Sequence, residues 1–359
     1  MNLPFPFTLV SKQPLIIHSY TLGGNLSIIK RLVPYLNTSK KRKIHFIFCL
    51  DWHITPERLK IFKHQYEKYM NKYPSLSITF LANDSLEYEI LKNIGINSII
   101  CNQNAFLDEN KYIIKSCNKK LYNAVMNAHM SPYKRIDLAK DVHKSCLITY
   151  LIKGVKESEE YSKYILSLPY MSFPQFDGSN WERYNTEQIC TIYAQSRCGL
   201  ILSAEEGACF AATEYLLCGL PVVTTPSIGG RDVFFDPEYV VWTEATPEAV
   251  AEAVQKAISL PISAQEIRER TIAKIKKVRE TYCDLLSSLA REEGIERDFR
   301  SEWDSFFVNK MMAFGSDSDA KAVKYLKEQG LVLNYSLLNR LHTAHRTFRI
   351  WWDHLRGKK

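Results

Sequence analysis

The sequence predicts an α/β protein with two doubly wound domains and a helical carboxyl-terminal region, and three observations lead to this prediction. The chain has 359 residues, whereas one domain usually holds about 100 to 200. Apolar runs typical of buried strands alternate with amphipathic segments typical of helices, and this alternation restarts near residue 120. Beyond about residue 263 only helical periodicity continues. We therefore expect domains at 1–115 and 116–262, and helices over 263–359 that return in part to the first domain.

The first domain is expected to alternate strands with helices. Its first apolar run, 15–18, is followed by Gly23 and Gly24, which allow a tight turn before the helical spacing of 26–36. The later elements are expected, in order, as a strand at 44–50, a helix at 56–72, a strand at 76–81, a helix at 85–93 closed by Gly95, and a strand at 98–101. Strands connected through helices run parallel, so we expect a parallel sheet.

The second domain repeats this alternation. Its last helix, 247–258, is predicted to begin after Thr246, because threonine is a good N-cap and Pro247 suits the first helical position. The preceding elements are expected, in order, as strands from 120–127 and 146–152, a helix at 157–167, a strand near 170–173, a helix at 186–195, a strand at 198–202, a helix at 209–218, and strands at 221–224 and 239–242.

Composition restricts the class of protein. With 46% hydrophobic and 24% charged residues, the chain is typical of a globular protein and not of a disordered or fibrous one. No apolar run approaches the roughly 20 residues that span a bilayer, and the amino terminus lacks a signal pattern, so we expect a cytoplasmic location. The nine cysteines show no Cys-x-x-Cys spacing and are expected as buried free thiols. The net charge of +8 suits an anionic partner without identifying it.

Residues 201–230 carry the most informative pattern. A buried strand ends at Ser203, a loop holds Glu206, and a helix begins near Cys209 and ends at Gly219. A helix start at the carboxyl edge of a parallel sheet is an anion site, because its N–H groups lack partners and the helix dipole is positive there.

Two carboxylates flank this expected anion site. Glu206 precedes the helix and Glu214 lies two turns along it, and carboxylates accept hydrogen bonds from the hydroxyls of a sugar or ribose. Glu214 lies among apolar residues, where a carboxylate is costly to bury without a partner. A nucleotide sugar offers both phosphates and hydroxyls. The alternative is that Glu206 is a solvated loop residue and Glu214 an exposed helix residue.

This segment resembles the family 4 glycosyltransferases, a large group whose signature is a pair of glutamates separated by seven residues. Glu206 and Glu214 fit that spacing, residues 218–223 are similar to the family's Gly-x-Pro-Val strand, and Gly229-Gly230 follow in the next loop. The resemblance covers most of 120–260. It implies the GT-B fold, in which two Rossmann-like domains face a cleft. It further implies that Glu206 contacts the donor sugar, that Glu214 binds the ribose, and that the helix start binds the diphosphate through Gly207, Ala208, Cys209 and Phe210.

The resemblance also implies two cations that neutralise the diphosphate, an arginine and a lysine five residues later. Lys134 matches the lysine, and His129 stands where the arginine is expected. Imidazole is largely neutral near pH 7, so donor affinity is expected to be weaker, or activity lost, unless Arg135 substitutes as the cation. Arg135 and Lys140 have the right spacing for an alternative register, and all of these cations could instead be surface residues at a helix start.

In the first domain, Gly23-Gly24 resembles the family's glycine turn near the donor phosphate and the acceptor. His53, after the strand at 44–50, is the best match to the family's histidine near the reacting sugar, and His18 is the next. A structural histidine packed under Trp52 is the alternative interpretation of His53.

Two carboxyl-terminal features have competing interpretations. Asp317-Ser318-Asp319 has the spacing of metal-binding carboxylates but suits a helix cap better, so no metal site is predicted. The tail 342–356 alternates cations with aromatic residues. It is expected either to contact an anionic membrane at the inner face of the cell membrane or to pack back on the protein.

The resemblance implies a retaining, metal-independent glycosyltransferase. Its donor would be a nucleotide-diphosphate sugar, no separate cofactor is expected, and the acceptor would be a glycan, a lipid-linked sugar or another hydroxyl compound. The alternatives are a GT-B epimerase or phosphorylase, and a non-catalytic protein that binds sugar nucleotides or acts as a scaffold. Nucleic acid is not an expected partner, because the cations are dispersed and no groove-reading or stacking motif is present.

Overall fold

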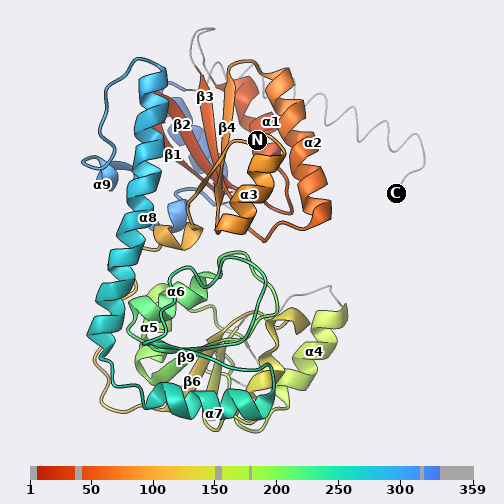
Figure 1. Ribbon diagram of the computed structural model, residues 1–359, viewed down its shortest axis with the longest axis vertical. Helices are drawn as coiled ribbons and strands as arrows, with labels where there is room; N and C mark the ends of the chain where they lie inside the picture. Colours follow the sequence, from red (N-terminus) through yellow and green to blue (C-terminus); the bar gives the residue numbers. More distant parts are fainter. Residues whose placement is uncertain (1–5, 37–42, 150–155, 178–179, 316–318, 332–359) are drawn as a thin grey trace, which may run out of the picture.

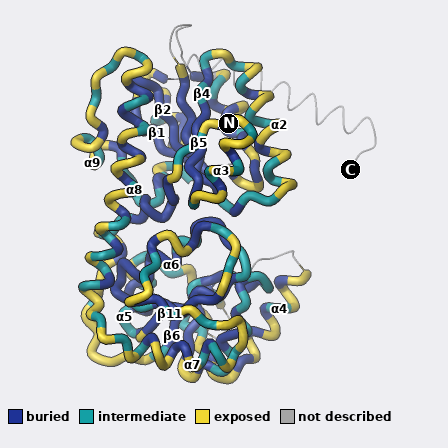
Figure 2. The backbone as a smooth tube through the Cα atoms, in the orientation of Figure 1, coloured by how far each residue is buried: buried dark blue, intermediate teal, exposed yellow. Residues whose placement is uncertain are grey.

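The computed structural model describes residues 6–36, 43–149, 156–177, 180–315 and 319–331. Two α/β lobes face each other, and the long helix α8 (Ala264–Glu292) runs along both (Figure 1). In each lobe the buried strands form the interior, whereas helices such as α2 and α4 carry exposed residues on the outside (Figure 2). No helix in the described part of the chain has the length and apolar character to cross a membrane.

The first lobe contains a five-stranded sheet in the order β1-β2-β3-β4-β5. Its strands and helices are β1 Phe7–Lys12, β2 Leu15–Tyr20, α1 Ser27–Leu32, the 3-10 turn η1 Val33–Tyr35, β3 Ile44–Cys49, α2 Pro56–Lys72, β4 Leu76–Ala82, α3 Ser85–Asn93 and β5 Ser98–Ile100. Strands β2 to β5 are parallel, as the alternation predicts. The sequence did not predict β1, which pairs antiparallel with β2 at the sheet edge and needs no connecting helix.

The second lobe contains a six-stranded parallel sheet in the order β11-β10-β9-β6-β7-β8. The side chain of Thr246 accepts a hydrogen bond from the N–H of Ala249 and caps α7, as predicted. The elements are β6 Tyr122–Asn127, η3 Pro132–Lys134, η4 Ile136–Ala139, β7 Ser145–Ile148, α4 Lys156–Leu166, β8 Met171–Ser172, α5 Thr186–Ala194, β9 Ser196–Ile201, α6 Phe210–Leu217, β10 Val222–Thr224, β11 Val240–Trp242 and α7 Pro247–Ile258.

Helix α8 joins the two cores. Its first half buries Ile267 and Ile275 in the second lobe, and its second half buries Tyr282 and Leu286 in the first. The chain then stays on the first lobe through α9 (Trp303–Phe306), η5 (Asn309–Met311) and α10 (Asp319–Glu328). The connection between the sheets contains the 3-10 turn η2 (Gln103–Phe106). Asp317, Ser318 and the tail 342–356 lie outside the described residues.

Candidate active site

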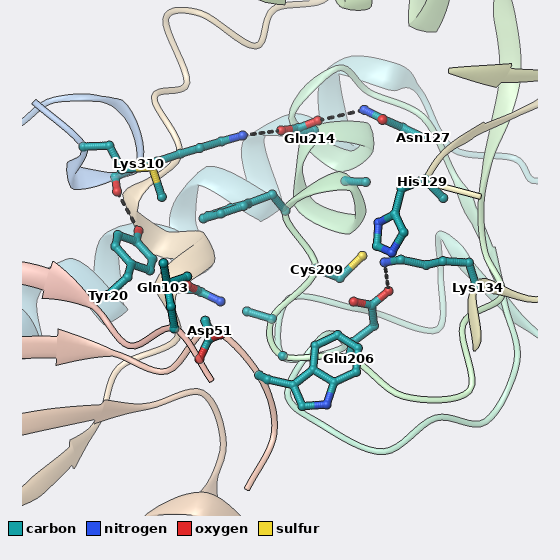
Figure 3. Close-up of a pocket in the computed structure, with 18 of the residues that line it drawn as sticks. Tyr20, Asp51, Gln103, Asn127, His129, Lys134, Glu206, Cys209, Glu214 and Lys310 are labelled. Atoms are coloured by element: carbon teal, nitrogen blue, oxygen red, sulfur yellow. Dashed lines mark hydrogen bonds and ion pairs between the residues drawn. The ribbon is translucent and has the colours of Figure 1, made fainter. Parts of the chain in front are cut away.

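A cavity of about 420 Å³ lies between the lobes, at the carboxyl ends of β2, β3, β6 and β9 (Figure 3). This volume is within the range of about 300 to 1,000 Å³ that is usual for ligand pockets. Among the residues that line it are Tyr20, Leu22, Asp51 and Trp52 from the first lobe, Gln103 from η2, His129, Tyr133, Lys134, Glu214 and the stretch Glu206–Ala211 from the second lobe, and Lys310 and Met312 from the carboxyl-terminal segment.

The start of α6 opens onto this cavity. Its N-cap residue, Cys209, has a left-handed φ of 53°, and no side chain caps the helix. Instead the amide of Asn104 donates to the carbonyl oxygens of Ala208 (2.6 Å) and Cys209 (3.1 Å). Because C=O and N–H of one planar peptide point in opposite directions, this contact turns the N–H groups of Cys209 and Phe210 away from Asn104. Among the described residues these N–H groups meet no acceptor, so they can bind an anion.

Glu206 and Lys134 form a buried ion pair at one side of the helix start. Burial by itself lowers the pKa of Lys134, but the neighbouring Cys209 and Glu206 raise it above its ordinary value. Burial also raises the pKa of the Cys209 thiol to about 12, so this thiol is neutral at pH 7. Gly229 lies against the backbone of Glu206. Its φ is +105°, and a Cβ there would collide with the carbonyl oxygen of Glu206.

His129 is neutral at pH 7. Burial and the positive charge of Lys134 lower the pKa of His129 to about 4, against a smaller opposing effect of Glu206. Its Nε2 lies 2.7 Å from the hydroxyl of Tyr133. The residue that stands where the resemblance expects an arginine therefore lines the cavity without bringing a charge to it.

Arg135 does not reach the cavity, in contrast to its expected place in the donor site. Its guanidinium donates to the carbonyl oxygens of Leu202 (2.6 Å), Ser203 (2.9 Å) and Pro226 (2.9 Å) and to the hydroxyl of Thr225 (2.9 Å). These contacts connect the loop after β9 to the loop after β10.

Glu214 occupies the other side of the helix start and is buried. Its Oε1 lies 3.0 Å from the Nζ of Lys310, and its Oε2 accepts a hydrogen bond from the hydroxyl of Tyr193 at 3.1 Å and a long one from the amide of Asn127 at 3.5 Å. The buried carboxylate thus has the partner that its apolar surroundings require. Lys310 was not anticipated, since no local signal relates it to a residue 96 positions earlier.

The glycine turn lies beside the cavity and not in its lining. The N–H of Gly23 donates to Oδ2 of Asp51 at 3.1 Å, so it is occupied by the protein itself. The same carboxylate accepts from the hydroxyl of Thr21 at 2.7 Å and from Arg58 at 3.1 Å. The turn thus positions Leu22 and Asp51, which line the cavity, while neither Gly23 nor Gly24 lines it.

Neither candidate histidine of the first lobe lines the cavity. Nε2 of His53 lies 2.9 Å from Oε2 of Glu205, and its ring lies next to that of Trp52, which does line the cavity. This arrangement corresponds to the structural alternative for His53. His18 is fully buried between Tyr282 and Cys49. Within the described residues, no group of three or more histidine, cysteine or acidic side chains is placed to hold a metal ion.

The lobes approach each other closely around the cavity. A Cβ on Gly207 would lie 2.8 Å from the carbonyl oxygen of Asp51, and one on Gly230 would lie 2.7 Å from the Cβ of Asn83. The amide of Asn102 donates to the carbonyl oxygen of Gly230 at 2.6 Å. Glycine is needed at these positions because the backbone of one lobe touches the other.

Residues 118–278 match the family model described as glycosyl transferases group 1. Among solved structures, Anabaena HepE in complex with UDP is 17% identical with a TM-score of 0.50, over 68% of this chain and 72% of that one. Sucrose-phosphate synthase from Thermosynechococcus elongatus is 14% identical with a TM-score of 0.52, over 81% and 74%. Trehalose 6-phosphate synthase from Burkholderia multivorans is 10% identical with a TM-score of 0.50, over 78% and 71%. The comparison with curated proteins returned no match.

These structural likenesses show the fold. The chain has the GT-B fold, with two Rossmann-like α/β lobes and a carboxyl-terminal region of helices.

Proposed function

We propose that the protein is a retaining, metal-independent glycosyltransferase that moves a sugar from a nucleotide-diphosphate sugar to a hydroxyl of a glycan, a lipid-linked sugar or another acceptor. The observation that carries this proposal is the uncapped start of α6, which faces the cavity between the buried carboxylates of Glu206 and Glu214. The match of residues 118–278 to group 1 glycosyl transferases supports it. HepE, with a similar fold, is a protein that binds UDP.

In the proposed reaction, the bond between the anomeric carbon and the donor phosphate oxygen breaks, and a bond to the acceptor oxygen forms on the same face of the sugar. The N–H groups of Cys209 and Phe210 and the ammonium of Lys134 stabilise the negative charge of the leaving diphosphate. The leaving phosphate oxygen accepts the proton of the acceptor hydroxyl, so the protein needs no separate strong base. Glu206 orients the sugar, and Glu214 binds the ribose.

Exclusion of water favours transfer over hydrolysis of the donor. The rings of Trp52 and Tyr133, one from each lobe, meet edge to face with their centroids 5.1 Å apart beside the cavity. An aromatic wall of this kind, together with the close backbone approach of the lobes, limits the entry of water when the donor is bound.

Two measurements on this protein test the proposal: donor binding and donor turnover. A thermal-shift screen with ADP, GDP, UDP and their sugar derivatives identifies the nucleotide, since a ligand that binds only the folded state stabilises it. Turnover of the selected donor is then followed with a panel of sugar acceptors, and the anomeric configuration of the product is determined by NMR. Glu206→Gln should abolish turnover. Glu205→Gln is the matched control, because that carboxylate contacts His53 and not Lys134. Full turnover by Glu206→Gln, or an inverted product, would contradict the proposal.

The neutral ring of His129 favours a second candidate, a protein that binds a sugar nucleotide without catalysis. The same screen separates the two functions. Nucleotide-sugar binding without transfer or hydrolysis over the whole acceptor panel supports this second candidate.

A further inference from the structure

The side chains that line the cavity carry more acidic than basic groups, which disfavours an anionic ligand. Asp51, Glu206 and Glu214 contribute three carboxylates, whereas Lys134 and Lys310 contribute two ammonium groups and His129 is neutral. A diphosphate adds further negative charge. The cations that remain on the cavity wall therefore matter more than they would if an arginine stood at position 129.

Lys310 enters this wall from the other lobe. Its carbonyl oxygen accepts a hydrogen bond from the hydroxyl of Tyr20 at 2.6 Å. The next residue, Met311, is fully buried in the core of the first lobe. The backbone of η5 is thus fixed to the first lobe, while the side chain of Lys310 crosses to Glu214 in the second (Figure 3).

The backbone at this point is strained. Lys310 has φ 62° and ψ 12°, and Met311 has φ 50°, both in the left-handed region that non-glycine residues rarely occupy. Strain of this kind persists where the surrounding structure enforces it, often at a functional site. Here one of the strained residues, Lys310, lines the cavity with its side chain.

The ammonium of Lys310 lies over the ring of the residue that begins α6. Its Nζ is 4.5 Å from the ring centroid of Phe210, the first residue of that helix. An ammonium group has three N–H donors, and Glu214 accepts one of them at 3.0 Å. Lys310 thus stands between the carboxylate proposed to bind the ribose and the helix start proposed to bind the diphosphate.

We propose that Lys310 is a binding residue for the anionic donor and supplies a positive charge to the cavity from the opposite lobe. This inference rests on the proposed function, because it concerns the nucleoside diphosphate of the same site. The backbone of Lys310 belongs to the first lobe and its ammonium group lies beside the diphosphate site of the second. Both lobes would therefore contribute charged groups to the bound diphosphate.

The test compares a nucleoside diphosphate with its uncharged nucleoside by isothermal titration calorimetry, using UDP, ADP and GDP as probes and then the nucleoside of the tightest one. Lys310→Met keeps a long side chain but removes the charge, and should weaken diphosphate binding about 10- to 100-fold, the usual size of a charge-assisted hydrogen bond. The affinity for the nucleoside should fall by less than about 3-fold, because the nucleoside has no phosphate for Lys310 to contact. Lys310→Arg should retain binding within about 5-fold.

Lys277→Met is the matched control, because it removes the same charge from an exposed position on α8. The unfolding temperature of each variant is measured alongside, and every variant keeps a non-glycine residue at position 310, so backbone strain is constant. Equal weakening of diphosphate and nucleoside by Lys310→Met, or no weakening at all, would overturn the inference while leaving the proposed function intact. If the unchanged protein binds none of the three diphosphates, the proposed function itself fails.

Discussion

Glu206 and Glu214 are two buried carboxylates on either side of one helix start, and each pairs with a lysine. Lys134, the partner of Glu206, lies in the same lobe. Lys310, the partner of Glu214, comes from a segment whose backbone is bound to the other lobe. Both ends of the cavity therefore pair a carboxylate with a lysine, but the lysine comes from the same lobe at one end and from the opposite lobe at the other. The Glu206 end is complete within one lobe, whereas the Glu214 end is complete only when both lobes are in place.

The two pairs also differ in burial. The side chains of Lys134 and Glu206 are 11% and 6% exposed, whereas those of Lys310 and Glu214 are 25% and 5% exposed. Removing one partner of a buried pair leaves the other charge unpaired in a medium of low dielectric constant. Where the lysine is partly exposed, water solvates part of the remaining charge and the cost is smaller. Changes at the Glu206 end should therefore affect both folding and turnover, and changes at the Glu214 end mainly affinity.

The largest effect on stability is expected from Lys134→Met, which leaves Glu206 buried without its cation. The free energy of unfolding should fall by about 3 to 5 kcal/mol, and turnover by about 100- to 1,000-fold, the usual loss when one stabilising donor is removed. Chemical denaturation and donor turnover measure the two effects. Lys134→Met combined with Glu206→Gln should recover part of the stability, because no charge is then stranded. Unchanged stability of the single variant would show that the pair is not buried in solution.

Gly229→Ala should damage the Glu206 end selectively. Its Cβ would collide with the carbonyl oxygen of Glu206 at a backbone φ of +105°, so we expect a loss of about 2 to 3 kcal/mol in the free energy of unfolding and lower turnover. Gly23→Ala is the control for backbone strain alone, because its φ is +62° and nothing lies within 4 Å of the added Cβ. That variant should lose only about 1 kcal/mol. Equal losses would mean that the contact with Glu206 has no effect.

Glu214→Gln should act on affinity more than on folding. Loss of the charged acceptor should weaken nucleoside diphosphate binding about 10-fold, and the free energy of unfolding should change by less than about 1 kcal/mol because Lys310 remains partly solvated. Calorimetry and denaturation measure the two. A loss of stability as large as that of Lys134→Met would remove the distinction between the two ends.

The smallest effect is expected from His129→Gln and concerns pH. The pKa of His129 is lowered to about 4 in the folded protein, against an ordinary value of 6.5. Between these values the unfolded chain binds more protons, so acidification destabilises the fold and rising pH restores it. His129→Gln should reduce the loss of stability between pH 7 and pH 5 by at most about 2 kcal/mol, and by less after screening by solvent. Burial also lowers the pKa values of His18 and His45. Both residues are present in the unchanged protein and in the variant, so their contributions cancel in the comparison. An identical pH profile would mean that His129 titrates normally.

The sequence determined the alternation of strands and helices, the capped starts of helices such as α7, and the glutamate spacing that puts Glu206 and Glu214 around one helix start. These features depend on residues close together in the chain, where side-chain periodicity and backbone preference act directly. Strand β1 was missed because an antiparallel edge strand has no part in a βαβ unit.

Only the tertiary structure decided which charged and polar groups share the cavity. Arg135, His53 and Gly23 have the expected positions in the sequence, but backbone carbonyls, Glu205 and Asp51 take up their hydrogen-bonding groups. Lys310 carries no local signal and still reaches Glu214. The physical reason is that a buried charge takes the partner nearest in space, and packing of the lobes along α8 determines which partner that is.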